Sequence, residues 1–211
     1  MLLKKKIIIV DYGLGNLLSV LRAVEAVGAF GKISTCARDI ESAERIILPG
    51  VGAFPKGMEG IRQKNLARCI QKKIREGVPL LGICLGMQLL FEESEEIKRT
   101  KGLAILAGKV KKIEAKSLKL PSIGWYPIKI GTKHKLECSL FKNIPANPKM
   151  YFLHSYRVSD YPEKTCIAFY NYGNKKIPAI IAKKNVIGCQ FHPEKSGVSG
   201  LQIIKNFIDL A

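Results

Sequence analysis

Short apolar blocks and amphipathic stretches take turns along the first half of the chain. The apolar blocks are rich in β-branched residues and have the length of buried strands, whereas the stretches between them repeat apolar residues at helical spacing. The predicted strands are 6–11, 32–36, 45–49 and 78–83. The predicted helices are 16–28, 40–44, 60–76 and 86–97. Strands that alternate with helices in this way predict a parallel sheet with crossover helices.

The pattern changes after Gly102, where short β runs follow one another without helices between them. These runs are 103–114, 123–130, 151–158, 165–172, 177–183 and 186–191. A closing helix over 199–210 has four apolar residues on one face, Leu201, Ile204, Phe207 and Ile208. We therefore expect one α/β domain over residues 1–211, in which helices flank a central, mostly parallel sheet and the C-terminal half is rich in β-structure.

The turn between strand 78–83 and the helix after it carries the clearest chemical signal. Its sequence, Gly82-Ile83-Cys84-Leu85-Gly86, has the form of a nucleophile elbow, where small flanking residues permit a strained turn that exposes the nucleophile. A thiolate at Cys84 would face the start of a helix, and the Leu85 peptide N–H would help to stabilise an oxyanion. The alternative is a buried structural cysteine, because free cysteines are among the most buried residues.

A cysteine nucleophile needs a base, and the base needs a group that orients it. The chain has three histidines, His134, His154 and His192. His192 follows the last predicted strand, and Glu194 stands two residues further on, so in an extended chain both side chains point to one face. Cys84, His192 and Glu194 are therefore predicted to form a catalytic triad. A structural histidine is the alternative, but it explains neither Glu194 nor the elbow.

These motifs together resemble those of the class I, triad-type glutamine amidotransferases. Further segments make the chain similar to the glutaminase subunits of imidazole glycerol phosphate synthases, which make ammonia for histidine biosynthesis. They are Asp11-Tyr12-Gly13-Leu14-Gly15-Asn16-Leu17, Leu48-Pro49-Gly50-Val51-Gly52-Ala53-Phe54, Ile123-Gly124-Trp125 and Leu153-His154-Ser155-Tyr156. The resemblance runs from about residue 7 to residue 207.

The resemblance implies roles for residues around the triad. Backbone N–H groups of Gly50, Val51 and Leu85 would bind the oxyanion, since Pro49-Gly50-Val51-Gly52 is similar to the family's oxyanion strand. Residues expected to bind glutamine are Gly52, Gln88, Glu96, Ser155 and Tyr156. An ordinary glycine turn is the alternative for the loop, and a solvated acidic run over 92–96 is the alternative for Glu96.

The resemblance also implies a partner, a (βα)8-barrel synthase subunit that receives the ammonia through a tunnel in a heterodimer. Residues expected at this interface are Asn16, Trp125, Tyr126 and Lys195. A place in the core is the alternative for Trp125. The chemistry requires neither a metal nor an organic cofactor, and the sequence has no Cys-x-x-Cys pair and no histidine spacing typical of a metal site.

The chain departs from the family pattern in partner-facing segments. It has Ser122 where a histidine is usual, Tyr126 where an asparagine is usual and Arg157 where a tyrosine is usual. These departures leave open a paralogous glutaminase that feeds a sugar-modifying synthase. From other classes, the alternatives are a cysteine hydrolase or protease of similar fold and a non-catalytic binding subunit.

Charge and cysteine content refine this picture. Thirty-five basic residues face 17 acidic ones, for a net charge of +18, but the lysine pairs stand at the ends of predicted elements and no nucleic-acid motif accompanies them. We expect a solvated surface or an acidic docking face on the partner rather than nucleic acid or membrane. The six cysteines, at 36, 69, 84, 138, 166 and 189, have no disulfide-like spacing, which is typical of a cytoplasmic protein.

Overall fold

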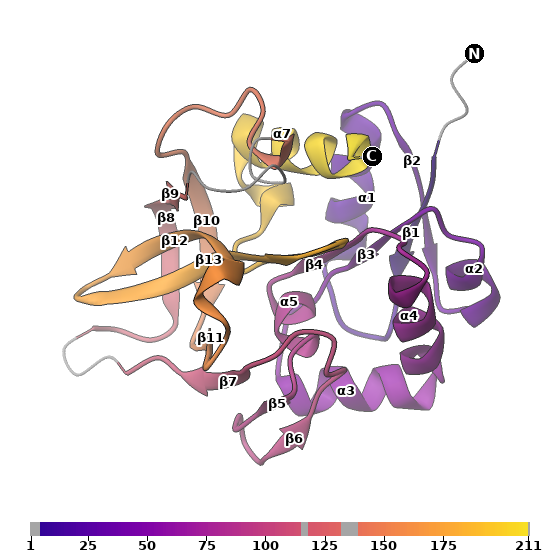
Figure 1. Ribbon diagram of the computed structural model, residues 1–211, viewed down its shortest axis with the longest axis horizontal. Helices are drawn as coiled ribbons and strands as arrows, with labels where there is room; N and C mark the ends of the chain where they lie inside the picture. Colours follow the sequence, from indigo (N-terminus) through magenta and orange to yellow (C-terminus); the bar gives the residue numbers. More distant parts are fainter. Residues whose placement is uncertain (1–4, 115–117, 132–138, 211) are drawn as a thin grey trace.

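The computed structural model describes residues 5–114, 118–131 and 139–210. An eight-stranded sheet runs through its middle (Figure 1). The order of its strands is β2 (Phe30–Ser34), β1 (Lys6–Val10), β3 (Arg45–Leu48), β4 (Leu80–Ile83), β14 (Val186–Cys189), β13 (Lys175–Lys183), β12 (Cys166–Tyr172) and β9 (Lys129–Ile130). The first five strands pair in parallel and the last three antiparallel, so the mostly parallel central sheet is confirmed.

Helices cover both faces of this sheet. On one face α1 (Leu17–Ala26) contacts α7 (Gly197–Asp209). The helices of the other face are α2 (Ala37–Glu41), α3 (Phe54–Gln63), α4 (Leu66–Arg75) and α5 (Leu85–Leu89). The side chains of β1 alternate between the two layers, because Ile7 and Ile9 pack into one buried cluster and Ile8 and Val10 into the other. A strand covered on both faces is apolar at every position, and this explains the apolar block at 7–10.

Two smaller sheets contain the remaining strands of the described residues. One pairs β8 (Ser122–Pro127) with β10 (Lys149–His154). The strands of the other, in order, are β11 (Tyr156–Ser159), β7 (Lys109–Lys112), β5 (Glu93–Ser94) and β6 (Thr100–Lys101). The predicted run 151–158 is therefore two strands that belong to different sheets and meet at Ser155.

Two predicted helices are wrong in length. The segment 60–76 lies across α3 and α4, which are separated where Asn65 takes a left-handed conformation with φ of 55°. The helix predicted over 86–97 is only Leu85–Leu89. It ends early because N–H groups of the loop after β6 donate hydrogen bonds to its last carbonyl groups. The N–H of Leu103 donates to Leu89 O at 2.9 Å, and the N–H of Ile105 donates to Leu90 O at 2.9 Å. The chain from Glu93 onward is then free to form β5.

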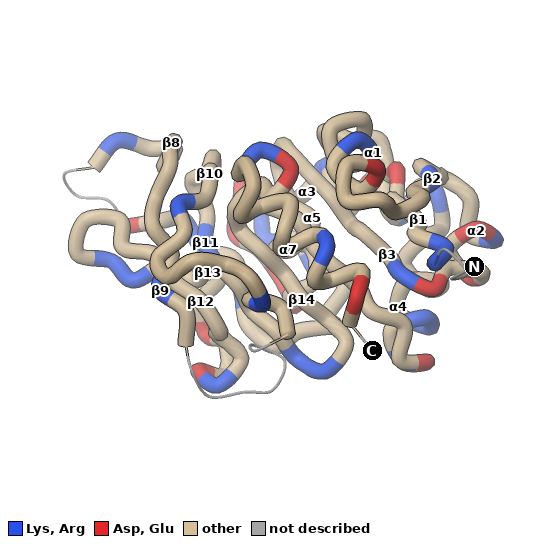
Figure 2. Tube along the Cα trace, turned by 90° about the horizontal axis from the view of Figure 1, so that it is seen from above, with Lys and Arg blue, Asp and Glu red and all other residues tan. Residues whose placement is uncertain are grey.

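Charged residues spread over most of the molecule rather than gathering on one element (Figure 2). Acidic side chains are interspersed with the basic ones, and several ion pairs link neighbouring elements at the surface. Lys32 of β2 pairs with Asp39 of α2, and Lys111 of β7 pairs with Asp160, both at 2.8 Å. Among the described residues no helix is both long enough and apolar enough to cross a bilayer. His134 and Cys138 lie outside the described residues.

The pairing of β4 with β14 at the centre of the sheet positions the residues of interest. Both strands run in parallel, so their carboxyl ends, which lead into Cys84 and His192, reach the same edge. Asn185 aligns the other ends: its side chain donates to Ile74 O at 2.9 Å and to Val78 O at 2.8 Å, and its carbonyl accepts from Leu80 N at 2.9 Å.

Replacing Asn185 by alanine is expected to destabilise the fold by about 1–3 kcal/mol, because two carbonyl groups lose their side-chain donor. Urea unfolding followed by circular dichroism measures the change. Asn171→Ala, at an exposed position on β12, is the matched control and is expected to change the free energy of unfolding by less than about 0.5 kcal/mol. Equal effects of the two substitutions would contradict this role of Asn185.

Candidate active site

Cys84 stands at a strained turn between β4 and α5. Its φ of 53° and ψ of −110° lie outside the regions that ordinary residues favour. The glycines on either side are required by close packing: a Cβ at Gly86 would collide with the Leu48 carbonyl, and one at Gly82 would lie 2.8 Å from Met87 Cα. The turn therefore has the geometry of the nucleophile elbow that the motif predicts.

The imidazole of His192 pairs with the carboxylate of Glu194 through Nδ1 and Oε1, which are 2.8 Å apart. Both side chains are almost completely buried. The reason given for this pairing from the sequence is wrong, because β14 ends at Cys189 and residues Pro193–Lys195 form a 3-10 turn rather than an extended chain. The turn still places the two side chains together.

The backbone of His192 is held from two sides. Its N–H donates to Tyr151 O at 2.9 Å, and its carbonyl accepts from the Ser196 hydroxyl at 2.6 Å. The same hydroxyl accepts from Tyr151 N at 3.0 Å, so Ser196 links the turn to β10. The sequence gives no sign of this function of Ser196 beyond its place in the motif.

Cys84 and His192 influence each other electrostatically. Burial acts to lower the pKa of His192, but Cys84 and Glu194 outweigh it and raise the pKa above its ordinary value. His192 Nε2 is buried and has no hydrogen-bond partner among the described residues. An imidazolium beside the cysteine favours the thiolate, and this is the protonation state required for nucleophilic attack.

A cavity of about 240 Å³ opens beside these residues. Most of the residues expected to bind substrate or oxyanion line it. Its lining residues are Val51, Gly52, Cys84, Leu85, Gln88, Glu96, Pro121, Leu153, His154, Ser155, Tyr156 and His192. Gly50 and Glu194 are not among its lining residues. His154 and Leu153 are lining residues for which the motif gave no role.

Glu96 faces this cavity and does not belong to a solvated acidic run. Its Oε2 accepts from the Phe54 N–H at 2.7 Å, and burial raises the pKa of its carboxyl group. Gln88 is buried, one helical turn after Cys84, and its N–H donates to Cys84 O at 3.2 Å. The cavity thus offers one carboxylate and one amide to a polar ligand.

The oxyanion site is not open in this conformation. The Leu85 N–H donates to the carbonyl of Gly50 at 3.3 Å, so the amide that would face an oxyanion is already occupied. Gly50 is closely packed, since a Cβ there would collide with the hydroxyl of Tyr12. That hydroxyl is buried and has no hydrogen-bond partner among the described residues, and burial raises the pKa of Tyr12.

The residues expected at a partner interface do not all face solvent. Trp125 is 52% exposed, so it is not a core residue, and Lys195 is exposed while Asn16 is half-buried. Tyr126 points to the opposite face of β8 from Trp125, where its ring packs on Tyr170 and Phe152. The ring of Tyr126 therefore does not lie on the exposed face of β8 with Trp125, and a place of Tyr126 at a partner interface stays a prediction.

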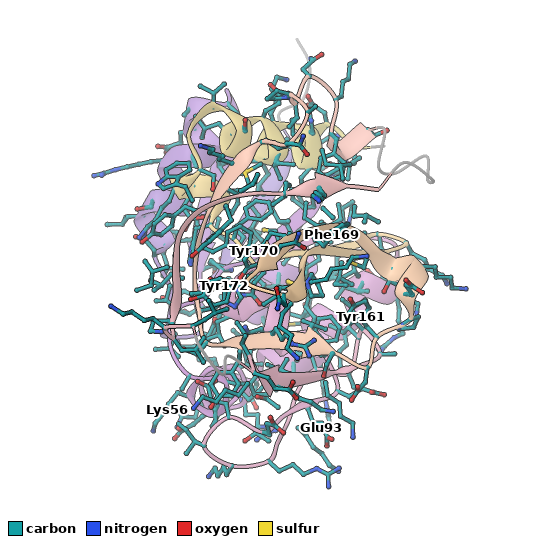
Figure 3. All side chains as sticks on the ribbon, turned by 90° about the vertical axis from the view of Figure 1, so that its left-hand side faces the viewer. Lys56, Glu93, Tyr161, Phe169, Tyr170 and Tyr172 are labelled. Carbon is teal, nitrogen blue, oxygen red and sulfur yellow. The ribbon has the colours of Figure 1, made fainter. Side chains whose placement is uncertain are left out.

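The two other unusual residues are also turned away from that surface. Ser122 is fully buried and its hydroxyl lies 3.2 Å from that of Tyr170. Arg157 lines a separate surface hollow with residues of β12 and the loop before it, among them Tyr161 and Phe169. Tyr161 and Phe169 are labelled in Figure 3. Neither residue alters the exposed face of β8 and β10.

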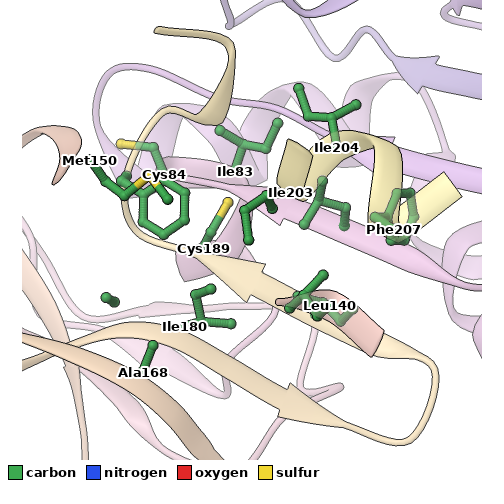
Figure 4. Close-up of a cluster of buried hydrophobic side chains, with 14 of the residues drawn as sticks. Ile83, Cys84, Leu140, Met150, Ala168, Ile180, Cys189, Ile203, Ile204 and Phe207 are labelled. Carbon is green, nitrogen blue, oxygen red and sulfur yellow. The ribbon is translucent and has the colours of Figure 1, made fainter. Parts of the chain in front are cut away.

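Cys84 belongs to the larger buried cluster. Cys84 and Cys189 are in this cluster with Ile83, and helix α7 contributes Ile203 and Phe207 from the far side (Figure 4). The five cysteines in the described part of the chain are all free thiols. The close packing beneath the elbow fixes the backbone that carries Cys84.

The comparison with known families agrees with this geometry. The family model for class I glutamine amidotransferases matches residues 8–210. The chain belongs to the class I glutamine amidotransferase family.

Its relatives are more specific. The chain is 44% identical over 209 residues to the imidazole glycerol phosphate synthase subunit HisH of Lactococcus lactis subsp. lactis, covering 97% of this chain and 98% of that protein. It is 46% identical over 207 residues to the subunit of the same name from Methanosarcina barkeri, covering 98% and 99%.

Solved structures share the fold at low sequence identity. A crystal structure of a glutamine amidotransferase superposes with a TM-score of 0.74 at 16% identity, covering 96% of this chain and 99% of that one. The structure of PurLQS from Thermotoga maritima also gives a TM-score of 0.74, at 20% identity, covering 97% and 98%.

Replacing Tyr12 by phenylalanine is expected to stabilise the protein by about 1–2 kcal/mol, because it removes a buried hydroxyl that has no partner. Tyr172→Phe is the matched control, since the Tyr172 hydroxyl donates to the Lys119 carbonyl and its loss is expected to destabilise. Urea unfolding at neutral pH measures both. A destabilised Tyr12→Phe variant would show that this hydroxyl has a partner in solution.

Proposed function

We propose that the chain is the glutaminase subunit of an imidazole glycerol phosphate synthase. It hydrolyses glutamine to glutamate and ammonia at Cys84, and the ammonia passes to a (βα)8-barrel synthase subunit in histidine biosynthesis. The observation that carries the proposal is the strained elbow cysteine beside the buried His192–Glu194 pair, in a chain whose HisH relatives match it over nearly its full length. Residues 1–211 are proposed to form this one glutaminase domain.

The chemistry follows from the roles proposed for the triad. The Cys84 thiolate attacks the side-chain amide carbon of glutamine, and a tetrahedral intermediate forms. His192 Nε2 gives its proton to the leaving nitrogen, the C–N bond breaks, and ammonia departs from a glutamyl thioester. A water molecule then gives a proton back to His192 and attacks the thioester, which releases glutamate and the thiolate. Glu194 orients the imidazole and stabilises its charged form.

The cavity suits the amino-acid end of glutamine. The Glu96 carboxylate is proposed to bind the α-ammonium group, because it is the carboxylate that lines the cavity. Gly52, Gln88, Ser155 and Tyr156 are proposed to complete the binding of the substrate. The reaction as written needs no metal or organic cofactor.

The oxyanion site supports regulation by a partner. With the Gly50 carbonyl on the Leu85 N–H, a developing oxyanion finds no donor from either Leu85 or Val51. Rotation of the Gly50–Val51 peptide would free Leu85 and turn the Val51 N–H toward the substrate. Loss of one such donor costs an enzyme about 10²–10³ in rate, so the closed form is expected to be nearly inactive.

An exposed apolar surface beside the cavity supports the proposed docking site of the partner. We call Ile123, Trp125 and Leu153 the apolar strip. Ile123 and Leu153 are directly opposite each other on β8 and β10, so they lie on one face, and Trp125 is on the same face two residues along. All three are more than one-third exposed, and Leu153 also lines the cavity. A partner on this strip would cover the cavity where ammonia is released.

The other candidate functions have less support. A cysteine protease of similar fold does not account for the match to the amidotransferase family, and a binding subunit does not account for the His192–Glu194 pair. A sugar-modifying synthase as partner was suggested by Ser122, Tyr126 and Arg157. Their side chains do not face the apolar strip, so they do not argue for a different partner.

Cys84→Ser is expected to lower glutamine hydrolysis by roughly 10³-fold or more while the protein stays folded, because the hydroxyl is a far weaker nucleophile than the thiolate. Release of glutamate from glutamine measures it. Cys36→Ser is the matched control, because Cys36 is an exposed cysteine outside the candidate active site. With a barrel subunit, synthesis from added ammonia should survive in Cys84→Ser. Near-normal glutaminase activity in that variant would sink the proposal.

Binding of the barrel subunit with its acceptor is expected to raise glutamine hydrolysis by about 10²–10³-fold, as a shift of 3–4 kcal/mol toward the open oxyanion site would do. Trp125→Ala should weaken complex formation, because it truncates the apolar strip.

Phe30→Ala is the control for Trp125→Ala. Phe30 is 63% exposed and lies on β2, an edge strand of the eight-stranded sheet. Titration calorimetry measures binding and a glutamate assay measures activation. If the histidine-pathway barrel subunit neither binds nor activates the folded wild-type protein, a sugar-modifying synthase becomes the better candidate.

A further inference from the structure

A buried glutamine that the motifs did not single out contacts the reactive sulfur. Gln190 follows β14 directly and is 1% exposed. Its Nε2 lies 3.7 Å from Cys84 Sγ, within the range of an N–H···S hydrogen bond. Its backbone N–H donates to Ala179 O at 2.9 Å, which anchors the residue to β13.

The orientation of the Gln190 amide is fixed by its neighbours. Gln190 Oε1 accepts from Gln88 Nε2 at 3.0 Å, so the Gln190 amino group must face the sulfur. Gln88 Nε2 gives its other hydrogen to Tyr156 O at 3.1 Å. That carbonyl also accepts from His154 Nδ1 at 2.8 Å. Gln190 therefore lies at the end of a buried chain of hydrogen bonds. These bonds fix which end of its amide group faces the sulfur.

Several titratable groups lie close enough to Cys84 to interact with its charge. A charge at Cys84 adds to burial in raising the pKa of Tyr12, Tyr170 and Cys189, and it also raises the pKa of His192. Of these four groups, His192 is the one that can become a cation. The helix that follows Cys84 has five residues, too few for a strong dipole.

We propose that Gln190 is a catalytic residue, whose amide N–H donates a hydrogen bond to the Cys84 sulfur and stabilises the thiolate on the side away from the substrate. This assignment rests on the proposed glutaminase function. The thiol form gains less, because its own contact as a donor is a long one, 3.8 Å to Leu153 O. A donor that binds the thiolate more strongly than the thiol stabilises the nucleophilic form of the cysteine.

The hydrogen bond acts twice in the cycle. In the resting enzyme it favours the nucleophile, and at the end of turnover it stabilises the thiolate that leaves the tetrahedral intermediate. Through its oxygen, Gln190 also fixes Gln88. Because both hydrogens of the Gln88 amino group are occupied, its amide oxygen is the polar atom left for the cavity.

Gln190→Met tests the proposal, since it keeps the length of the side chain and removes the donor. The rate of alkylation by iodoacetamide is measured against pH, with the Cys84→Ser variant subtracted to isolate Cys84. The apparent pKa of the thiol is expected to rise by about one unit, and kcat for glutamine in the partner complex to fall about 10-fold. Gln71→Met, which removes a half-buried glutamine bonded to Leu103 O, is the matched control and should change neither.

Gln190→Glu is a second test that keeps both the shape and the contact with Gln88. It places a carboxylate against the sulfur and should raise the thiol pKa more than methionine does, so an answer remains if Gln190→Met fails to fold. An unchanged alkylation profile with a raised KM for glutamine would overturn the assignment, because Gln190 would then act only on Gln88. Alkylation requires no glutamine, so this result is independent of whether the wild type proves to be a glutaminase.

Discussion

The candidate active site depends on the parallel pairing of β4 with β14 in the middle of the sheet. These strands lie more than one hundred residues apart in sequence, yet Gly82 is paired with Gly188 and Ile83 with Cys189. One more hydrogen bond, from Cys84 N to Cys189 O at 2.8 Å, continues the ladder into the elbow. Cys84, His192 and Gln190 thus share one edge of the sheet, and side chains on a rigid edge keep their distances when loops around them move.

The loop next to this edge contains Gly50, whose carbonyl occupies the Leu85 N–H. This loop belongs to the end of β3, next to β4, and it closes the oxyanion site by placing a carbonyl on the Leu85 N–H. In the proposed function, one peptide unit therefore separates the proposed triad of Cys84, His192 and Glu194 from a complete active site. Such a division suits an enzyme whose product is wasted unless an acceptor is present, because a small rearrangement suffices to change the rate.

The sequence predicts well those features that depend on local pattern. The parallel half, the elbow and the His192–Glu194 pair follow from apolar runs and short motifs. Features decided by distant contacts were missed. Residues 103–106 end α5 early, and the left-handed Asn65 divides one predicted helix into two. Side chains alternate between the two faces of a strand, so Trp125 and Tyr126 lie on opposite faces of β8. The sequence alone did not give the extent of β8 from which this follows.

Gln190 was missed for a different reason. A glutamine beside a strand end is unremarkable in sequence, and its importance comes from the sulfur and from Gln88, which lies about one hundred residues away. The 3-10 turn after His192 was missed as well, although the predicted pairing was found. The pairing of His192 with Glu194 was therefore predicted correctly from a wrong backbone geometry. Side chains that are two residues apart in sequence can meet in many backbone conformations.

The buried hydrogen bonds that connect Gln88 to His154, Tyr170 and Ser122 have only one possible assignment of donors and acceptors. Burial lowers the pKa of His154 to about 4, so its ring is neutral near physiological pH and carries one hydrogen. With Nδ1–H on the Tyr156 carbonyl, Nε2 must accept from the Tyr170 hydroxyl at 2.8 Å, and the oxygen of Tyr170 is then an acceptor for Ser122. Each hydrogen in this chain of hydrogen bonds therefore has one donor and one acceptor. The direction of these hydrogen bonds is therefore the same at any pH well above 4, and the Gln190 amide that faces the Cys84 sulfur keeps its orientation.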